Sequence, residues 1–570
     1  MSTSEPAESD APEPESDISE PELGPEPEPA LAPGPGPVPP APTTTGSWAP
    51  MRNGVYRSLW FAQLGSNVGS WMQTVGAQWL LVSHAHASTL VALVQTASLL
   101  PVMVLSLPAG VLADVFDRRR LLLVSQSAMA VTAGILALLT QSHLATPATL
   151  LALTFVLGCG QAVTGPAWQA IQPELVEREQ IPAAAALGSL TVNLARAIGP
   201  AVAGLIVATT GPAAVFGLNA ISFLGVVGAL FVWRRVPAAT ALRPEPAVSA
   251  LYAGTRYVQH APSVRRILLR SGLFVIPGSA LWALLPVIAR DKLGMGAAGY
   301  GGLLGALGVG AVLGALYLSR LRARFAMNVL LAASALGFGV ATLVLAIPLG
   351  GAAVPVVAVL MVVGGLAWIV SLSTLNASLQ LTLPAWVRAR GFGAYLVVFM
   401  GGQAIGSVVW GGLGSAIGDA GALTTAAVLL GLCALSLRVW PLRPVLAGVG
   451  HSTVEEAHWP EPALVFEPEP DDGPVMVTRH YTVAEESRSA FLAAMEHVGR
   501  SMRRTGATNW AVYRDGSTPD GFTEVFTVRS WDEHLRQHDG RMTDADREFE
   551  RVAGELAIGE PVVEHFFPPR

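Results

Sequence analysis

Apolar residues dominate the chain from about residue 56 to residue 440, in runs that are each close to the roughly 20 residues needed to cross a bilayer as a helix. Because a backbone in lipid must satisfy its own hydrogen bonds, and because the runs are too long and too apolar for alternating barrel strands, we predict helices. The twelve predicted spans are 58–82, 88–113, 119–141, 147–171, 183–209, 212–233, 265–289, 297–319, 326–349, 353–376, 391–417 and 420–440.

Composition agrees with a membrane location. Of the 570 residues, 51% are hydrophobic and only 13% are charged, whereas soluble proteins carry about 25% charged residues. The two cysteines, Cys159 and Cys433, lie within apolar runs, which argues against a disulfide framework. The first residues are acidic and rich in proline, so no secretory signal peptide is predicted.

Arginines fix an orientation. If the N-terminus lies inside, the predicted cytoplasmic segments hold nearly all the arginines between the spans, and the external loops hold only Arg290 and Lys292. The positive-inside rule therefore predicts a multi-pass protein of the plasma membrane with both termini in the cytoplasm. A missed helix would invert the bias of every later loop, so the alternation also supports twelve spans.

Polar segments divide the chain into domains. We predict an acidic, Pro-rich disordered tail, two six-helix bundles joined by a cytoplasmic loop that includes a short basic surface helix, and a linker that leads to a soluble domain. The predicted boundaries are 1–49 for the tail, 50–233 and 265–440 for the bundles, 234–264 for the loop, 441–473 for the linker and 474–570 for the soluble domain.

The two bundles share three weakly similar segments, in the same order and roughly 200 residues apart. "GVLADVFDRRR" at 110–120 matches "GALYLSRLRAR" at 314–324, and "ARAIGPAVAG" at 195–204 matches "GQAIGSVVWG" at 402–411. "QPELVER" and "LPAWVRAR" form the third pair. Together they indicate a duplicated six-helix unit.

The chain resembles the major facilitator superfamily at two of these segments. The loop after the second span matches the family's pattern at Gly110, Leu112, Ala113, Asp114, Arg118 and Arg119, and departs from it at Val115 and Asp117. In the fifth span, "IGPAVAG" is similar to the motif of the family's exporters, or antiporters, at Gly199, Pro200 and Gly204.

The most similar branch is that of drug and siderophore exporters of the transmembrane secretion effector type, on "GPAWQAIQPELV" and "NLARAIGPAVAG". The resemblance implies secondary export of small molecules (drugs, siderophores or secondary metabolites) by alternating access in exchange for protons. An importer is the alternative direction.

Asp114 lies at the cytoplasmic end of the second span, where water tolerates charge. Positive-inside anchoring explains the neighbouring arginines but not this carboxylate. An aspartate there can face a helix N-terminus in one conformation and lose that contact in the other. We predict a conformational latch made of Gly110, Asp114, Arg118 and Arg119.

Arg196 is predicted near the middle of the fifth span, where a charge costs at least about 2.5–3.5 kcal/mol. We expect it to line a central cavity and bind an anionic or carbonyl-rich group of the substrate; the alternative is a structural arginine bonded to backbone carbonyls. Other polar residues are expected in the same cavity, or alternatively to hydrogen-bond a neighbouring helix. They are Gln63, Asn67, Gln161, Trp168, Asn193 and Gln403.

Several kinds of chemistry are not predicted. No Asp or Glu lies at the centre of any span, so proton coupling rests on the resemblance alone. No Walker motif indicates an ATP-driven pump, and we predict no catalytic residue, cofactor, metal site or nucleic-acid partner. The expected partners are a small-molecule substrate, the proton gradient and membrane lipid.

The C-terminal segment predicts a small ferredoxin-like α+β domain with the order βαββαβ. Thr482 with Glu485 and Ser530 with Glu533 predict capping boxes, and "GSTPDG" predicts a hairpin turn. The domain resembles the antibiotic-biosynthesis-monooxygenase type of dimeric barrel, which implies a dimerising or regulatory module. The alternative is a bifunctional exporter whose C-terminal domain binds or oxidises a metabolite, in a pocket lined by Trp510, Tyr513, Trp531, His534 and His538.

Overall fold

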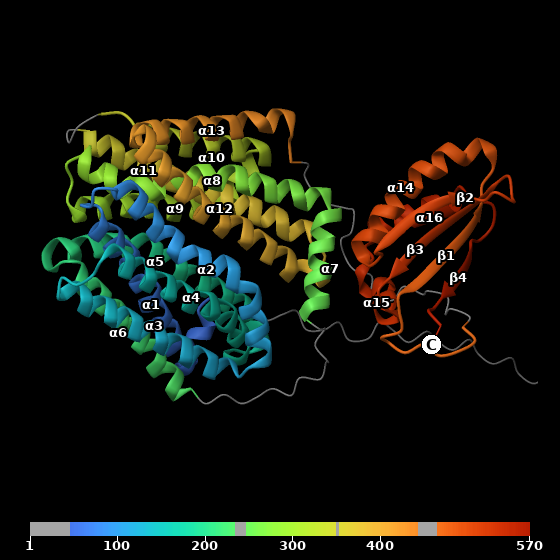
Figure 1. Cartoon of the computed structure of the whole chain (residues 1–570), viewed down its shortest axis with the longest axis horizontal. Helices are drawn as coiled ribbons and strands as arrows, with labels where there is room; N and C mark the ends of the chain where they lie inside the picture. Colours follow the sequence, from blue (N-terminus) through green and yellow to red (C-terminus); the bar gives the residue numbers. More distant parts are fainter. Residues whose placement is uncertain (1–45, 234–246, 349–352, 443–463, 570) are drawn as a thin grey trace, which may run out of the picture. The chain divides into compact units, whose positions relative to one another are not determined.

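The computed structural model describes residues 46–233, 247–348, 353–442 and 464–569. Most of the predicted disordered tail and of the predicted linker therefore lies outside the described residues. Within them, the chain is mostly helical up to residue 442 and ends in a small domain with a sheet (Figure 1).

Long helices form two successive sets, and each predicted span corresponds to one of them. The first half contains α1 (Gly54–Leu81), α2 (Ala87–Val115), α3 (Arg118–Gln141), α4 (Pro147–Leu175), α5 (Ile181–Thr210) and α6 (Pro212–Val232). The second half contains α8 (Pro262–Asp291), α9 (Ala297–Arg324), α10 (Met327–Val344), α11 (Val354–Thr382), α12 (Arg388–Ile417) and α13 (Asp419–Val439).

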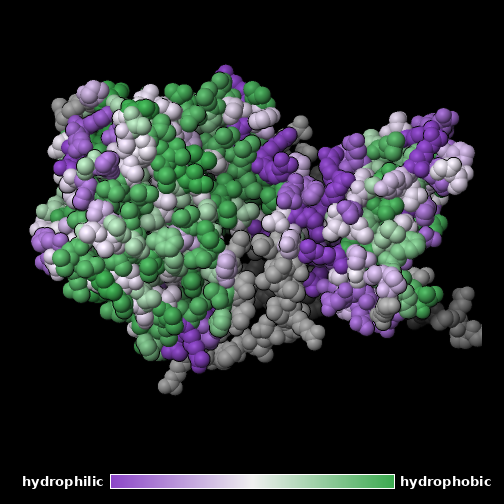
Figure 2. Space-filling model, viewed as in Figure 1, coloured by the Kyte–Doolittle hydropathy of each residue, from purple (hydrophilic) through white to green (hydrophobic). Residues whose placement is uncertain are grey.

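Eleven helices in the described part of the chain are long and apolar enough to cross a membrane. Hydrophobic residues cover much of the visible surface of these helices (Figure 2). Helix α1 has the length but is not among the eleven, because its hydropathy is lowered by the carboxamides Gln63, Asn67, Gln73 and Gln78. The membrane-spanning character of eleven helices is thus supported, and the predicted count of twelve is not confirmed.

Two glycines turn the chain at matching places in the two halves. Gly211, between α5 and α6, has φ 87°, and Gly418, between α12 and α13, has φ 80°. This left-handed conformation favours glycine because it has no Cβ. The shared turn agrees with the duplication that the sequence indicates.

The arginine-rich turns are those between α2 and α3, with Arg118, Arg119 and Arg120, and between α9 and α10, with Arg320, Arg322 and Arg324. The halves meet at the helix ends opposite these turns. Helices α5 and α9 approach backbone to backbone, since a Cβ on Gly204 would lie 2.6 Å from the carbonyl oxygen of Ala297. Helices α2 and α12 are joined by hydrogen bonds, with Thr96 Oγ1 donating to the carbonyl of Ala404 at 2.9 Å. Tyr300 of α9 also donates to Gln78 of α1 at 2.6 Å. One end of the interface is therefore tightly closed.

Helix α7 (Ala247–His260) lies between the two halves in sequence and matches the helix predicted in the connecting loop. Its Tyr257 is buried in a hydrophobic cluster with residues of α8, α11 and α12 such as Ile267, Leu379 and Tyr395. A Cβ on Gly254 would lie 2.7 Å from Cβ of Arg390 in α12. One face of α7 therefore packs on protein, where a surface helix would present that face to lipid.

The C-terminal domain holds an antiparallel sheet of the order β2-β3-β1-β4. Its strands are β1 (Val475–Thr482), β2 (Asn509–Arg514), β3 (Gly521–Val528) and β4 (Val562–Phe566). Helices α14 (Arg488–Thr505) and α16 (Asp544–Glu555) pack against one face of the sheet, and α15 (Trp531–Arg536) with the π-helical turn η6 (Gln537–Arg541) precedes α16 (Figure 1). The chain order agrees with the predicted βαββαβ pattern.

One of the two predicted capping boxes is wrong and the other forms in part. Thr482 pairs with Gly521 as the last residue of β1, and α14 begins only at Arg488, after the short helix η5 (Glu485–Ser487). Ser530 does accept a hydrogen bond from the amide of Glu533 at 3.2 Å. The Glu533 side chain, however, bonds to arginines and does not return to the cap.

The close approach of α5 and α9 can be tested with Gly204→Ala. The added methyl group meets backbone on α9, so we expect a loss of about 1–3 kcal/mol in stability and a lower thermal midpoint of the purified protein. Gly217→Ala in α6 is the matched control, because no atom lies within 4 Å of its Cβ position. Equal midpoints for the two variants would contradict this account.

Candidate functional site

A cavity of about 460 Å³ lies among α1, α4 and α5 in the first half. None of its lining residues carries a charge. Its wall is made of amide and hydroxyl side chains together with aromatic rings: Gln63, Asn67, Gln161, Thr164, Gln169 and Gln172, with Tyr56, Trp60 and Trp168. Such a wall suits a ligand that exchanges hydrogen bonds and offers planar surface.

Helical spacing explains why polar residues of α4 line the cavity together. Gln161, Trp168 and Gln172 fall at steps of seven and four residues along α4 and so share one face. Gln63 Nε2 donates to Asn67 Oδ1 at 3.1 Å within α1, and Gln161 Nε2 donates to Ser70 Oγ at 3.1 Å across to α1. Gln63 Oε1 is buried and has no hydrogen-bond partner within the part of the chain that the structure describes. The cavity wall thus holds an acceptor to which no described residue donates.

Four predicted cavity residues line this cavity, and three do not. Gln63, Asn67, Gln161 and Trp168 are in its wall. Asn193, Gln403 and Arg196 are not in its wall. Asn193 donates to the carbonyl of Ser189 in its own helix at 2.9 Å, and Gln403 is buried in α12 with 8% exposure.

Arg196, the third, lies one turn beyond the cavity-lining Val192 on α5. Its guanidinium carbon lies 5.9 Å from the ring centroid of Trp71 in α1. Among the described residues, no carbonyl accepts a hydrogen bond from the Arg196 guanidinium and no carboxylate pairs with it. The contacts therefore do not include the backbone carbonyls that a purely structural role requires.

Trp71 also connects Arg196 with the second half, which the sequence did not reveal. Its ring lies 6.1 Å from that of Trp282 in α8, which in turn lies 5.9 Å from Trp368 in α11. The indole Nε1 of Trp282 is buried, and no described residue accepts a hydrogen bond from it. In the sequence, this aromatic group shows only as three tryptophans within predicted spans. Bulky rings in a span are as often packed in the protein core, so the sequence alone did not single them out. The guanidinium thus lies where aromatic residues of both halves meet.

The exporter-like motif acts through close packing. A Cβ on Gly199 would lie 2.6 Å from Cβ of Trp71, so the glycine lets α1 approach α5 beside Arg196. Gly204 permits the approach of α9 described above, and Pro200 between them is buried inside α5. The motif therefore determines how Trp71 of α1 packs on α5 and how closely α5 contacts α9 of the other half.

The predicted latch residues occupy the end of α2 and the start of α3. The side chain of Asp114 lies outside the described residues, and Gly110 faces open space. Arg118 pairs with Glu174 of α4 at 2.8 Å, and Arg119 donates to the carbonyl of Leu230 in α6 at 2.8 Å. The two arginines therefore tie helix ends together within one half.

Asp117, a departure from the family's loop pattern, has a local role. Its side chain caps α3 by accepting from the amide of Arg120 at 2.8 Å. An aspartate directly before a helix is a common N-cap, so the sequence did contain this signal.

The pocket residues predicted for the C-terminal domain are only partly assembled. Trp531, His534 and His538 lie together, and His565 of β4 joins them with its Nε2 3.1 Å from that of His534. Trp510 instead donates to Glu524 at 2.6 Å. The remaining residue, Tyr513, is 59% exposed. No group of three or more His, Cys, Asp and Glu residues in the described ranges could hold a metal ion.

Burial keeps this histidine cluster neutral. Burial and the neighbouring His565 and Arg479 lower the pKa of His534 to about 3. Burial, with His534 next in importance, lowers the pKa of His538 to about 2. The two side chains therefore act as neutral packing groups at neutral pH.

Two successive sets of long helices, eleven of which are apolar enough to span a membrane, and an uncharged polar cavity within the first set are the architecture of a membrane transporter of the major facilitator type. A family model described as "Transmembrane secretion effector" matches residues 45–567, and the chain belongs to this family.

Among curated relatives, the enterobactin exporter EntS of Shigella boydii serotype 4 (strain Sb227) is 29% identical over 366 residues, which are 63% of this chain and 85% of that protein. The staphyloferrin A transporter of Staphylococcus aureus (strain NCTC 8325 / PS 47) is 34% identical over 142 residues. That match spans 25% of this chain and only 36% of the staphylococcal protein.

Solved transporters share the fold. The nucleoside transporter NupG aligns with a TM-score of 0.54 at 14% identity, over 68% of this chain and 98% of that chain. A bacterial homologue of the human lysosomal transporter Spinster, in an inward-facing and unoccupied conformation, aligns with a TM-score of 0.52 at 14% identity, over 68% of this chain and 95% of that chain. The family match and the curated relatives, which are transporters and not enzymes, confirm the prediction of a membrane transporter in place of an enzyme.

The histidine cluster predicts a pH dependence of the C-terminal domain. Because the folded pKa values are lowered, the unfolded chain binds more protons below its own pKa of about 6.5, and stability falls as pH falls below that value. We expect the free energy of unfolding to fall by up to about 1.4 kcal/mol per histidine for each pH unit. Hydrogen exchange of the β1 and β3 amides, corrected for the pH dependence of the intrinsic exchange rates, measures this free energy. In His538→Leu the slope of the free energy against pH should decrease by the contribution of about one proton, and an unchanged slope would contradict the assignment.

Proposed function

We propose that this protein is a secondary active exporter of small molecules that works by alternating access and proton antiport. The halves are closed at one end by the contacts at Gly204, Thr96 and Tyr300. The cavity lies toward the other end, next to the arginine-rich turns. If these turns are cytoplasmic, as the positive-inside rule indicates, this is an inward-facing arrangement ready to take substrate from the cytoplasm.

The observation that carries the proposal is Arg196. Among the described residues the Arg196 guanidinium has no acidic partner and no carbonyl acceptor, and it lies beside an aromatic group that both halves build, so it is positioned to bind an anionic or carbonyl-rich substrate group. The amide wall of the cavity would bind the uncharged part of the same molecule. The names of the relatives, an enterobactin exporter and a staphyloferrin A transporter, support siderophore-like cargo.

Several finer features belong to the same proposal. Helix α1 is the twelfth spanning helix. Its polar residues face the cavity and the neighbouring helices and so avoid contact with lipid. Both termini lie in the cytoplasm at the plasma membrane, and Gly110, Asp114, Arg118 and Arg119 form the latch between conformations. The C-terminal domain is a ferredoxin-like module that dimerises or regulates.

The role of Arg196 predicts a selective loss of transport. In cells that accumulate enterobactin or staphyloferrin A, Arg196→Gln should raise substrate retention about 10- to 100-fold, as expected for a lost charged hydrogen bond of about 1.5–3 kcal/mol. Arg320→Gln, at an exposed position of α9, is the control and should keep export. If Arg196→Gln exports at the rate of the parent, Arg196 is not part of the substrate site. If the parent protein instead takes the substrate up into the cells, it is an importer.

Proton coupling predicts a dependence on the gradient. In inverted vesicles energised to an acidic interior, accumulation of the same probes should cease when a protonophore collapses the gradient. Added ATP should drive no accumulation while the protonophore is present. Transport that continues without the gradient would contradict antiport with protons.

A further inference from the structure

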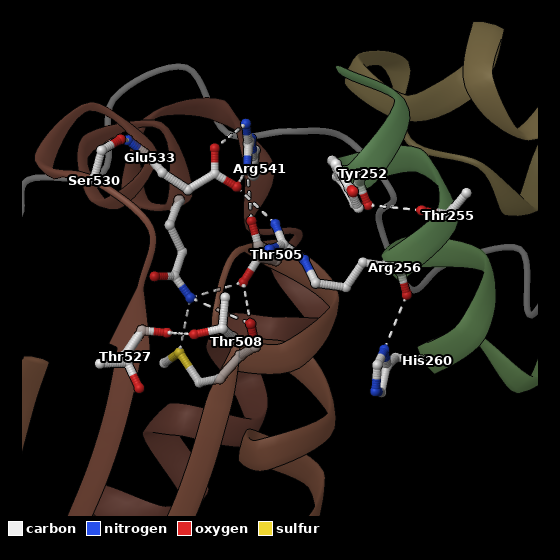
Figure 3. A network of polar contacts seen from close by, with 12 residues as sticks. Tyr252, Thr255, Arg256, His260, Thr505, Thr508, Thr527, Ser530, Glu533 and Arg541 are labelled. Carbon is white, nitrogen blue, oxygen red and sulfur yellow. Dashed lines mark hydrogen bonds and ion pairs between the residues drawn. The ribbon is translucent and has the colours of Figure 1, made fainter. Parts of the chain in front are cut away.

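The C-terminal domain contacts the transporter through one carboxylate held by two arginines (Figure 3). Arg256 of α7 donates to Glu533 Oε1 at 2.6 Å, and the two side chains are only 16% and 14% exposed. Arg541 of the domain donates to both oxygens of Glu533, at 2.7 and 3.1 Å. We call this group of three the Glu533 clamp.

Charge and geometry both favour the clamp. Burial alone would raise the pKa of Glu533, but hydrogen bonds and charge from Arg541 and Arg256 lower it, so the carboxylate stays ionised at cytoplasmic pH. Paired, partly desolvated charges with several hydrogen bonds are among the stronger polar contacts in proteins. If one partner is removed, the others are left poorly solvated.

Aromatic rings of the transporter receive further arginines of the domain. Arg529 lies 4.4 Å from the ring centroid of Tyr252, and Arg504 lies 5.9 Å from that of Tyr257, both on α7. Arg541 of the clamp itself lies 5.0 Å from the ring of Trp386. A cation over an aromatic face is attracted by the ring's quadrupole. The contact is therefore a built surface with several independent points.

Trp386 gives the contact its significance. It belongs to η4 (Ala385–Val387), the turn between α11 and α12, and its ring packs edge-on against Tyr257 of α7. The matching turn of the first half is η2 (Arg178–Gln180), between the cavity-lining helices α4 and α5. In alternating access, closure of the cavity mouth brings the matching ends of the two halves together. The domain is thus fixed to a turn that has to move.

We propose that the docked C-terminal domain is an autoinhibitory brake, which holds η4 and α7 in their inward-facing positions until the Glu533 clamp opens. The inference rests on the proposed alternating-access function. A signal that weakens the clamp raises the population of outward-facing protein, and a stronger clamp arrests the cycle with its cavity open to the cytoplasm.

The test measures access to the cavity in the full-length protein. Cys159 and Cys433 are replaced by serine, Ser189→Cys is introduced in the cavity wall, and labelling by an impermeant maleimide is followed in inverted vesicles. Arg256→Gln opens the clamp while the Glu533–Arg541 pair within the domain is kept. We expect labelling to slow about fivefold, the lower end of typical allosteric couplings. An unchanged rate would overturn the brake.

Arg551→Gln is the matched control, since Arg551 is 54% exposed and its ion pairs with described residues are those with Glu548 and Glu555 of its own helix. Its labelling rate should equal that of the parent. A fivefold loss in this variant as well would show a general effect of lost charge and would overturn the brake too.

A reducible cross-link tests the opposite direction. In a protein without Ser189→Cys, Tyr252→Cys and Arg529→Cys are joined by a bis-methanethiosulfonate reagent long enough to replace the two side chains that meet there. The cross-link should stop export and a reductant should restore it, and export that continues with the cross-link formed would overturn the brake. Because labelling needs no substrate, a failure of the exporter proposal would show as absent export in the parent, with the labelling differences intact.

Discussion

The close approach of α5 to α9 is the constraint on which the rest of the structure depends. Gly204 and Gly301 remove the side chains that would separate the two helices, so the halves can meet backbone to backbone. Gly199, on the same helix, lets Trp71 pack beside Arg196. In a bilayer an apolar side chain gains little by moving from lipid to a protein neighbour, so helices associate mainly through close van der Waals packing, which small residues permit. The closed end and the aromatic group around Arg196 both follow from this one stripe of small residues.

Electrostatics divides the candidate site into two parts. The cavity wall is uncharged, so an ion bound there would lose hydration without a counter-charge. The guanidinium of Arg196 lies just beyond that wall, where an anionic group could be compensated. A substrate that satisfies both parts carries an uncharged hydrogen-bonding body and at least one anionic or carbonyl-rich group. This division explains why the cavity residues and Arg196 do not share one lining.

Hydrophobic runs predicted the helices well because each run is long, and only a helix satisfies its backbone in lipid. The three repeated segments likewise predicted two related halves, and the left-handed turns at Gly211 and Gly418 agree with that prediction. The sequence was less informative wherever a side chain has two possible neighbours. Asn193 was expected in the cavity and bonds its own helix, and Thr482 was expected to cap a helix and ends a strand, because tertiary pairing decided both. The contact of α7 with Glu533 joins residues 277 positions apart, which no local pattern reports.

The central claim is that the two halves exchange which end of their interface is closed. Spin labels at Glu179→Cys and Arg388→Cys report on the cavity end, and labels at His143→Cys and Gly296→Cys report on the end opposite the arginine-rich turns. Distances measured by pulsed electron resonance in nanodiscs, with and without enterobactin as a probe and at two pH values, should shift in opposite directions at the two ends. Distances that stay fixed at both ends, or that lengthen together, would contradict alternating access and the account built on it.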